Sequence, residues 1–165
     1  MRTETGRAIV TGPFQIRMAS NADSGAIRAV VHAGRAEYSL VEPGRLDADL
    51  DDIEQHYLMQ GGSFEVVVAG DGRIIGCAGL RPMGDCRAEL CKMYLAKEAR
   101  GRGLGRQLLE NALAAARSAG FREVWAETNS VLTSAIRLYK RYGFELLSGQ
   151  QLSMQCDEAY VLRLF

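Results

Sequence analysis

Apolar residues alternate with polar ones along some stretches of the chain and recur every three to four residues along others. Alternation is typical of half-buried strands, and the longer period is typical of amphipathic helices. The alternating or continuously apolar stretches predict strands at residues 14–17, 64–69, 73–80, 87–95, 123–127, 144–147 and 159–164. The longer period predicts helices from residue 20 or 21 to 37 and at residues 47–60, 104–119 and 132–142. This order of elements predicts a single α/β domain with a mixed, mostly antiparallel sheet of six to seven strands, flanked by about four helices.

Glycines mark where several of these elements end. Residues 70–72 read Gly-Asp-Gly between two apolar runs, which predicts a tight hairpin. Gly120 and Gly143 each follow a predicted helix, where a glycine suits the left-handed backbone of a C-terminal cap. Residues 1–12 show no period and predict a loose lead-in, so we expect the folded domain to occupy residues 13–165.

The stretch from Met93 to Arg106 is the most informative about chemistry, because an apolar strand passes through a glycine-rich, basic turn directly into a helix. Glycines let main-chain N–H groups come close to a ligand, and the first helical turn adds unpaired donors and the positive end of its dipole. Residues 97–106 hold four basic side chains and one acidic side chain, a local net charge of +3. The pattern predicts a binding site for a diphosphate. The alternative is a solvated basic turn that only caps the helix.

Two common phosphate motifs do not fit the spacing of this turn. Its glycines stand at positions 101, 103 and 105, and Arg106 occupies the place of the third glycine in the dinucleotide fingerprint G-x-G-x-x-G. No lysine follows these glycines as the nucleotide-triphosphate loop requires. The nicotinamide and triphosphate interpretations are therefore both rejected.

What remains is Arg100-x-x-Gly103-x-Gly105, followed by a second element over residues 135–144 that reads A-x-x-L-Y-x-x-x-G-F. Together these two elements resemble the motifs of the GNAT (Gcn5-related) N-acetyltransferases. Residues 14–19 also read like the opening strand of that family, so the resemblance covers nearly the whole chain from residue 14 to 165.

The resemblance implies a GNAT-like fold and a cosubstrate. In this family the turn holds the pyrophosphate of acetyl-coenzyme A, and the strand before the turn splays from its neighbour so that its main chain contacts the pantetheine arm. The implied contacts lie on the end of that strand and on the turn, at Met93, Tyr94, Leu95, Arg100, Gly101, Arg102, Gly103, Leu104, Gly105 and Arg106. Many members carry an asparagine seven residues before the motif tyrosine, where this chain has Leu132. We therefore assign no cofactor contact to Leu132, and nearby Asn129 is a weaker candidate.

Tyr139 is the candidate general acid, since it matches the tyrosine of the second motif. A phenol with a pKa of about 10 can protonate or hydrogen-bond the thiolate that leaves when an amine attacks a thioester. The alternative is a purely structural role, because Leu132, Ala135, Ile136, Tyr139 and Tyr142 share one face of the predicted helix.

A base is also required, because an alkylammonium with a pKa of about 10.4 has no lone pair at neutral pH. Glu89 lies on the predicted strand ahead of the turn and is the candidate base, acting directly or through water. The alternative is a strand-edge glutamate paired with Lys92 or Arg87. No cysteine stands in a recognisable nucleophile setting, so we expect direct transfer in a ternary complex rather than a covalent acetyl-enzyme.

Residues 37–60 carry seven acidic side chains and one arginine, a local net charge of −6. In the resembled family the first two helices and their connection line the acceptor entrance, so one hypothesis is a cationic amine acceptor. The alternative, which we favour, is acidic residues placed at a helix N-terminus, where the dipole stabilises them.

Composition narrows the function classes. The chain has 165 residues, 47% of them hydrophobic, and zero formal net charge, which is typical of one globular domain without a nucleic-acid partner. No apolar run approaches the roughly 18 residues of a membrane span and the start has no secretory pattern, so we expect a cytoplasmic protein without a membrane partner. The four cysteines form no C-x-x-C pair, which predicts free buried thiols and no metal. The strand edges leave a homodimer open.

These features predict an acetyl-coenzyme A-dependent N-acetyltransferase that moves an acetyl group to a primary amine of a small molecule or peptide. The alternative from another class is a non-catalytic acyl-coenzyme A sensor or interaction module on the same fold. The two hypotheses differ at Tyr139 and Glu89, because a sensor needs neither an acid nor a base.

Overall fold

The computed structural model describes residues 9–11, 13–40, 47–153 and 155–165. Its strands are β1 (Ile9–Thr11), β2 (Phe14–Met18), β3 (Ser63–Ala69), β4 (Ile74–Gly84), β5 (Arg87–Leu95), β6 (Glu123–Thr128), β7 (Glu145–Leu147) and β8 (Glu158–Arg163). Its α-helices are α1 (Ser24–Glu37), α2 (Leu104–Ser118) and α3 (Thr133–Arg141), joined by short helical turns η1 (Asn21–Asp23), η2 (Ala48–Asp51), η3 (Glu54–Leu58) and η4 (Lys97–Ala99).

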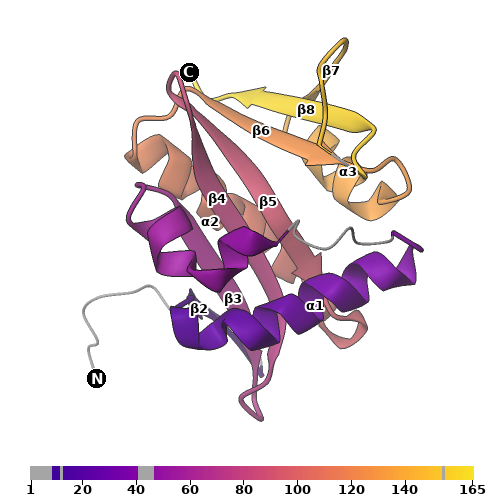
Figure 1. The fold of residues 1–165 in the computed structure, drawn as a ribbon. Helices are drawn as coiled ribbons and strands as arrows, with labels where there is room; N and C mark the ends of the chain where they lie inside the picture. Colours follow the sequence, from indigo (N-terminus) through magenta and orange to yellow (C-terminus); the bar gives the residue numbers. More distant parts are fainter. Residues whose placement is uncertain (1–8, 12, 41–46, 154) are drawn as a thin grey trace.

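The strands form one sheet in the order β1-β2-β3-β4-β5-β6-β8-β7, and only β5 and β6 run parallel (Figure 1). The expected α/β fold with a mixed, mostly antiparallel sheet is confirmed. The seven predicted strands are all present, and β1 adds an eighth that pairs with β2. The start of the domain at residue 13 stays a prediction, and residues 1–8 and 12 lie outside the described residues.

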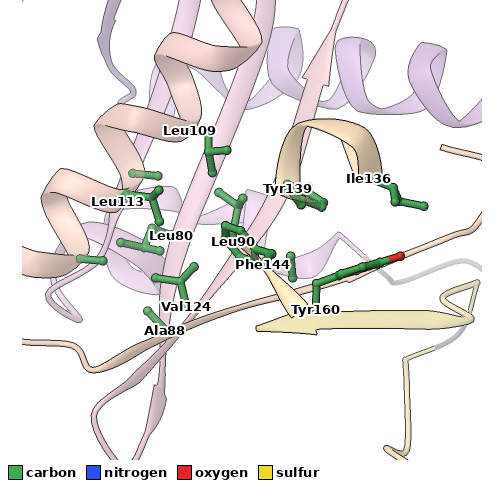
Figure 2. Close-up of a cluster of buried hydrophobic side chains, with 13 residues drawn as sticks. Leu80, Ala88, Leu90, Leu109, Leu113, Val124, Ile136, Tyr139, Phe144 and Tyr160 are labelled. Atoms are coloured by element: carbon green, nitrogen blue, oxygen red, sulfur yellow. The ribbon is translucent and has the colours of Figure 1, made fainter. Parts of the chain in front are cut away.

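Helices cover both faces of the sheet. On one face, α1 packs Ile27 and Val31 against β3 and β4, in a cluster that also takes in η2 and η3. On the other face, α2 presents the stripe expected from its period, and all six of its members are buried: Leu104, Leu108, Leu109, Ala112, Leu113 and Ala116. Figure 2 shows α2 meeting α3 over β5 and β6, with Leu109 and Leu113 from one helix and Ile136 and Tyr139 from the other. Burial of these faces supplies the main driving force for folding.

The predicted helix over residues 47–60 is wrong as a single element. The segment forms two short pieces, η2 and the π-helical turn η3, with Asp52 extended between them at φ −143°. The Asp52 carboxylate accepts a hydrogen bond from the N–H of Gln55, the kind of local contact by which aspartate interrupts helices. Four aspartates within residues 47–52 therefore override the apolar period.

The pairing of β5 decides where a site can form. Its first residues, Arg87–Glu89, pair with β6, and beyond Glu89 the two strands have no further register. Figure 1 shows β5 and β6 diverging from there. An irregularity in the β4–β5 register falls in the same stretch, where Lys92 has a positive φ of 54°. The second half of β5 thus turns one edge of main-chain polar groups away from any strand partner.

Candidate functional site

Two adjoining cavities open where β5 leaves β6. The turn cavity lies between β5, α1 and the start of α2, and its wall includes Gly34, Tyr38, Leu95, Arg100 and Gly105. The inner cavity lies deeper, and its wall includes Arg81, Glu89, Cys91, Glu127 and Tyr139. The two cavities share four wall residues, Met93, Tyr94, Leu132 and Ala135. A ligand can therefore extend from the turn into the inner cavity along the free edge of β5.

Tyr94 is held at this junction by the absence of a side chain on α1. A Cβ on Gly34 would lie 2.4 Å from Cδ1 of Tyr94, so only glycine lets the helix approach the ring so closely. Burial raises the pKa of the Tyr94 phenol, and the guanidinium of Arg35 opposes that shift. Tyr94 therefore stays neutral in the common wall.

The turn from residue 100 to 106 has the geometry of an anion cradle. Gly101 and Gly103 have φ of 71° and 77°, and a Cβ on either would meet nothing within 4 Å, so both face open space. Gly103 is the N-cap of α2. Within the described part of the chain, no acceptor binds the N–H groups of residues 101–106. Unpaired donors and the positive helix end thus point to the same place, as the sequence predicts.

The arginines of the turn are engaged within the protein. Arg100 forms a two-pronged ion pair with Glu37 on α1, at 2.7 and 2.6 Å, and also donates to the carbonyl oxygen of Leu95. Arg102 donates to the carbonyl of Glu98 and lies over the ring of Phe14. These guanidiniums shape the turn and raise its local potential, while the main chain provides the free donors.

The side chains of Arg106 and Leu104 do not face the open side of the turn as contacts with a bound cofactor would require. Arg106 pairs with Glu110 one helical turn on, at 2.9 Å. Leu104 is 1% exposed and belongs to the core, so only its N–H can face a ligand. The cofactor contacts expected for the ten turn and strand residues stay predictions.

Tyr139 belongs to the core and also lines the inner cavity, while its role as general acid stays a prediction. Its ring packs in the core beside Phe144 and Tyr160, with ring centroids 5.3 and 6.3 Å away (Figure 2). The residue also lines the inner cavity, and no described residue makes a hydrogen bond with its hydroxyl, which is not sealed from solvent. Burial raises the pKa of Tyr139 above its usual value of 10. The phenol is thus held neutral, with its proton available to a ligand.

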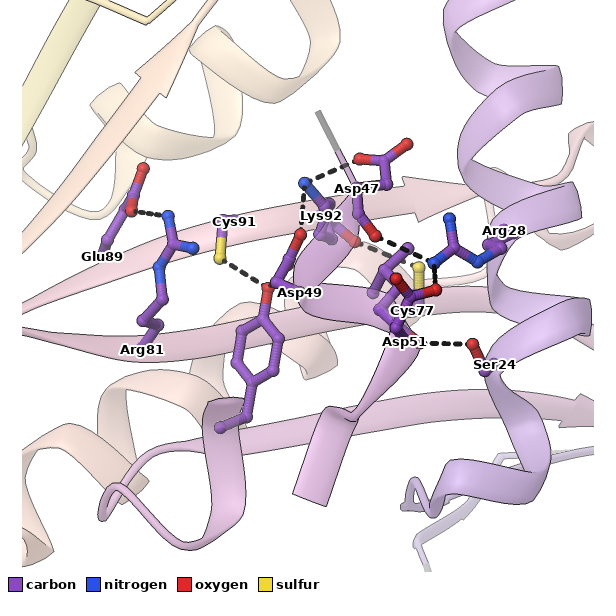
Figure 3. Close-up of polar contacts among 12 residues, drawn as sticks. Ser24, Arg28, Asp47, Asp49, Asp51, Cys77, Arg81, Glu89, Cys91 and Lys92 are labelled. Carbon is purple, nitrogen blue, oxygen red and sulfur yellow. Dashed lines mark hydrogen bonds and ion pairs between the residues drawn. The ribbon is translucent and has the colours of Figure 1, made fainter. Parts of the chain in front are cut away.

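Glu89 lines the same cavity, but its partner differs from the two expected. It stands opposite Arg81 in the β4–β5 register, and Nη2 of Arg81 lies 2.6 Å from its Oε2 (Figure 3). Lys92 instead pairs with Asp47, and Arg87 pairs with Asp85. The sequence interpretation missed Arg81, because the pairing depends on strand register and not on spacing along one strand.

Asn129 uses its side-chain amide for hydrogen bonds to neighbouring loop residues. Its Nδ2 donates to the carbonyl of Gln155 at 2.8 Å, and its Oδ1 accepts from the N–H of Val131. These contacts fix the end of β6 beside the inner cavity. Leu132 follows as an apolar member of the common wall, and whether it contacts a cofactor stays untested.

The acidic stretch does not form a free anionic lip among its described residues. Asp47 is buried between Arg35 and Lys92, at 2.7 and 2.8 Å, and Asp49 accepts a hydrogen bond from Tyr57. Figure 3 shows Lys92 between Asp47 and Asp49. The remaining described members are paired as well: Glu37 with Arg100, Asp51 with Arg28, Asp52 with Asn21, and Glu54 with the N–H of Asn21. The ion pairs of Glu37, Asp47 and Asp51 bring counter-charges from other elements, so a local sum along the sequence overstates the net charge in space. Asp52 and Glu54 bind the neutral Asn21 and keep their charge. Glu42 and Arg45 lie outside the described residues.

In the ionic cluster of Asp47, Arg35 and Lys92, the contacts shift the pKa values of Asp47 and Lys92 toward the charged forms. Burial by itself would raise the pKa of Asp47, but hydrogen bonds from Arg35 and Lys92 outweigh burial and lower it. Burial likewise would lower the pKa of Lys92, and Asp47 raises it. Cys91, between this cluster and the inner cavity, has its pKa raised to about 12 by burial, so its thiol stays protonated and weakly nucleophilic.

All four cysteines are free, as predicted, but they are not all buried. Cys77 is buried, Cys91 and Cys156 are half-buried, and Cys86 is exposed in the turn before β5. Within the described residues, no cluster of histidine, cysteine or acidic side chains is suited to bind a metal ion. None of the described helices has both the length and the apolar composition of a membrane span.

Comparison with known proteins agrees with this geometry. Residues 30–144 match the model of the acetyltransferase (GNAT) family. The uncharacterized N-acetyltransferase YjgM of Escherichia coli is 36% identical over 129 residues, which cover 74% of this chain and 77% of that protein. The chain therefore belongs to the GNAT family. It spans about half the length of vertebrate relatives such as human N-acetyltransferase 8B, of which it covers 46%.

Solved structures show the same fold. An acetyltransferase of the GNAT family from Staphylococcus aureus superposes with a TM-score of 0.84 over 92% of this chain and 99% of its own, at 21% identity. The structure of yncA from Salmonella typhimurium, solved with its cofactor acetyl-CoA, superposes with a TM-score of 0.73 at 23% identity and covers 93% of this chain and 95% of its own.

The residues of this chain fit acetyl-coenzyme A. The diphosphate requires several converging donors, and the N–H groups of residues 101–106 are unpaired beside two glycines that leave open space. The extended pantetheine arm requires a groove with main-chain polar groups, and β5 beyond Glu89 supplies both.

Proposed function

We propose that this protein is an acetyl-coenzyme A-dependent N-acetyltransferase that moves an acetyl group directly to a primary amine. One observation carries the proposal. Two adjoining cavities, which share four wall residues, extend from the unpaired donors of the turn, along the free edge of β5, to the unpartnered hydroxyl of Tyr139. A protein that only stored the ligand would not require a neutral, unpartnered phenol at the inner end of these cavities.

The chain's own groups then have separate roles. When bound, the thioester supplies an activated acetyl group. The turn orients the diphosphate, and the free main chain of β5 aligns the arm. Tyr139 donates a proton to, or hydrogen-bonds, the sulfur as the carbon–sulfur bond breaks. Glu89 accepts the proton of the acceptor ammonium, directly or through water.

Direct transfer is favoured over a covalent acetyl-enzyme. Cys91 and Cys156 both line the inner cavity, and burial raises the pKa of each thiol. Neither thiol has a histidine partner among the described residues, so neither is activated as a nucleophile.

The test combines binding with turnover. Calorimetry is expected to show that acetyl-coenzyme A binds the purified protein far more tightly than inorganic pyrophosphate does. A thiol-release assay over amines, amino acids, aminoglycosides and peptides is expected to show acceptor-dependent formation of free coenzyme A. Binding without thiol release from any acceptor would support the non-catalytic sensor instead, and the absence of binding would reject both.

The role of Glu89 needs its own measurement. Glu89→Gln keeps the shape of the side chain and removes its basicity, so the pH profile of kcat/KM is expected to lose the limb that reports the base. An unchanged profile would place the base elsewhere, with Glu127 in the same cavity wall as the next candidate.

A further inference from the structure

We propose that the acceptor is a free α-amino acid, whose carboxylate binds Arg81 while its ammonium binds Glu89. The proposal rests on the acetyltransferase function above and names its substrate class. It replaces the cationic acceptor suggested by local charge along the sequence, because the acidic side chains behind that idea are paired within the protein.

Arg81 is the cation of the inner cavity that retains unused donors. It enters the cavity wall from β4, and Nη2 is the atom that it uses toward Glu89. Its Nε and Nη1 groups have no acceptor among the described residues. The side chain is 39% exposed, so a ligand in the cavity can reach it. A guanidinium with a free edge is suited to a carboxylate, because two parallel N–H groups match two oxygens.

The other two cations of this wall are already neutralised. Arg35 and Lys92 both bind Asp47, and Lys92 also lies 3.5 Å from Asp49. Extra negative charge on a ligand therefore gains little from them. The cavity is matched to one carboxylate group rather than to several.

Glu89 supplies the complementary anion immediately beside that cation. Its Oε2 binds Arg81, and its Oε1 has no partner in the described part of the chain. In an α-amino acid the ammonium and the carboxylate are attached to the same carbon, so a matching site needs a cation and an anion in direct contact. The 2.6 Å pair of Arg81 and Glu89 meets that requirement. A polyamine or a peptide N-terminus would satisfy Glu89 and leave the free edge of Arg81 unused.

The same arrangement places the nucleophile. Glu89 takes a proton from the ammonium, and the amine nitrogen forms a bond to the thioester carbonyl carbon. The carbon–sulfur bond breaks with its electron pair on sulfur, which receives a proton from Tyr139. As the amide forms, its nitrogen loses a second proton, which returns through water to the Tyr139 phenolate. The products are an N-acetyl amino acid, coenzyme A with a free thiol, and one proton, which Glu89 releases to solvent.

The experiment compares acceptors that differ only in the carboxylate, such as leucine, leucinamide and isopentylamine, within a panel that repeats this set for other side chains. We expect kcat/KM for the preferred amino acid to exceed that for its amide and its amine by about 10- to 100-fold. In Arg81→Met, which also removes the partner of Glu89, activity on all three compounds is expected to fall, but the KM for the acid is expected to rise most, so that the preference disappears. A purely structural role for Arg81 would lower activity on all three compounds equally.

Two further variants keep the test decisive. Arg73→Met removes an exposed arginine that pairs with Asp71 outside both cavities, and it is expected to keep the preference. Arg81→Lys retains the charge without the fork and is expected to keep an intermediate preference. It provides the readout if the melting curve shows that Arg81→Met does not fold.

Binding is measured separately from turnover, by calorimetric titration of the preferred amino acid and its amide into protein saturated with coenzyme A. Weaker binding of the amide supports the proposal. Equal binding of acid and amide, or thiol release that is as fast with amines lacking a carboxylate, overturns the amino-acid assignment and leaves the acetyltransferase intact. Failure of acetyl-coenzyme A to bind removes the proposed function as well.

Discussion

In the proposed function, the turn at residues 100–106 and the wall of the inner cavity each hold a charged ligand, but by opposite means. The turn offers main-chain N–H groups beside Gly101 and Gly103, and its arginines are engaged with protein acceptors. The inner wall offers side chains, arranged as ion pairs that join β4, β5 and the η2 region. A main-chain cradle recognises a group common to every reaction of a family, whereas a side-chain wall can change its ligand with one substitution.

The two regions also differ in how a substitution affects them. Two of the glycines in the turn face open space, so a substitution at either position strains only the local backbone. The inner wall holds buried charges, for which loss of one partner leaves another charge uncompensated. The predictions below separate these two behaviours.

The largest expected effect is at Asp47, which neutralises Arg35 and Lys92. Asp47→Asn replaces the carboxylate that both buried cations contact with a neutral amide, and we expect it to lower the free energy of unfolding by about 3 to 5 kcal/mol. Urea unfolding at pH 7 measures the change. Asp51→Asn is the matched control, because the Asp51 side chain is 75% exposed, and it is expected to change stability little.

The contribution of Asp47 has a defined pH dependence. Its pKa in the folded protein lies below the ordinary 3.8, so the unfolded chain takes up this proton first as pH falls. The stabilisation is therefore complete above about pH 4 and decreases as pH falls further toward the lowered pKa. The difference in stability between wild type and Asp47→Asn is expected to shrink between pH 5 and pH 2, and a constant difference would contradict the ion-pair explanation.

Tyr139→Phe is expected to have the next largest effect, on chemistry alone. The ring packing with Phe144 and Tyr160 is kept, so the melting temperature should stay close to that of the wild type. Loss of the proton donor is expected to lower kcat by about 100-fold or more, while the Kd for acetyl-coenzyme A is unchanged. Unchanged turnover would remove Tyr139 from the mechanism, and lower stability would show that the hydroxyl has a structural role.

The regions differ, too, in how far the sequence predicts them. The turn was predictable because Arg100, Gly103 and the helix that follows are contiguous, and their backbone requirements are local. The stripe on α2 and the extent of β5 follow from simple periods in the same way. The two roles weighed for Tyr139, core residue and general acid, were likewise visible in the sequence as two interpretations of one helical face.

The inner wall was not predictable by the same reasoning. Arg35, Asp47 and Lys92 stand on three separate elements, and Arg81 meets Glu89 only through the β4–β5 register. Counting charge along residues 37–60 therefore raised the hypothesis of a cationic acceptor, which we did not favour, and missed the ion pairs that compensate part of that charge. Contacts between distant residues depend on tertiary structure, which neither period nor spacing records.

The third prediction tests the main-chain cradle with two glycines of similar geometry. Gly103 and Gly120 have φ of 77° and 81°, and a Cβ on either meets nothing within 4 Å. Valine at either position is expected to cause similar strain and a similar loss of stability. Only Gly103→Val is expected to weaken acetyl-coenzyme A binding, by about 10- to 100-fold in Kd, because it blocks the approach of the diphosphate. Equal affinity in the two variants would place the diphosphate elsewhere.

The smallest expected effect is at Glu37, where side-chain charge modifies the main-chain cradle. Glu37 binds Arg100 through both oxygens, and this hydrogen bonding lowers the pKa of its carboxyl group, so the pair is fully ionised at neutral pH. Glu37→Gln removes the negative charge beside the turn and keeps a hydrogen-bonding group. The potential at the turn becomes more positive, so we expect acetyl-coenzyme A to bind a few-fold more tightly at low salt, with the gain disappearing as salt screens the charge.

Calorimetry at two ionic strengths measures this change in Kd, and Glu98→Gln is the matched control. Glu98 also lies next to the turn, where its carboxylate contacts Arg73 at 3.4 Å and only its main-chain carbonyl accepts from Arg102. A similar salt-dependent gain in both variants would show that only net charge near the cradle matters. Weaker binding in Glu37→Gln alone would instead show that the ion pair with Arg100 holds the turn in its binding shape, so that even the main-chain region depends on one side-chain contact.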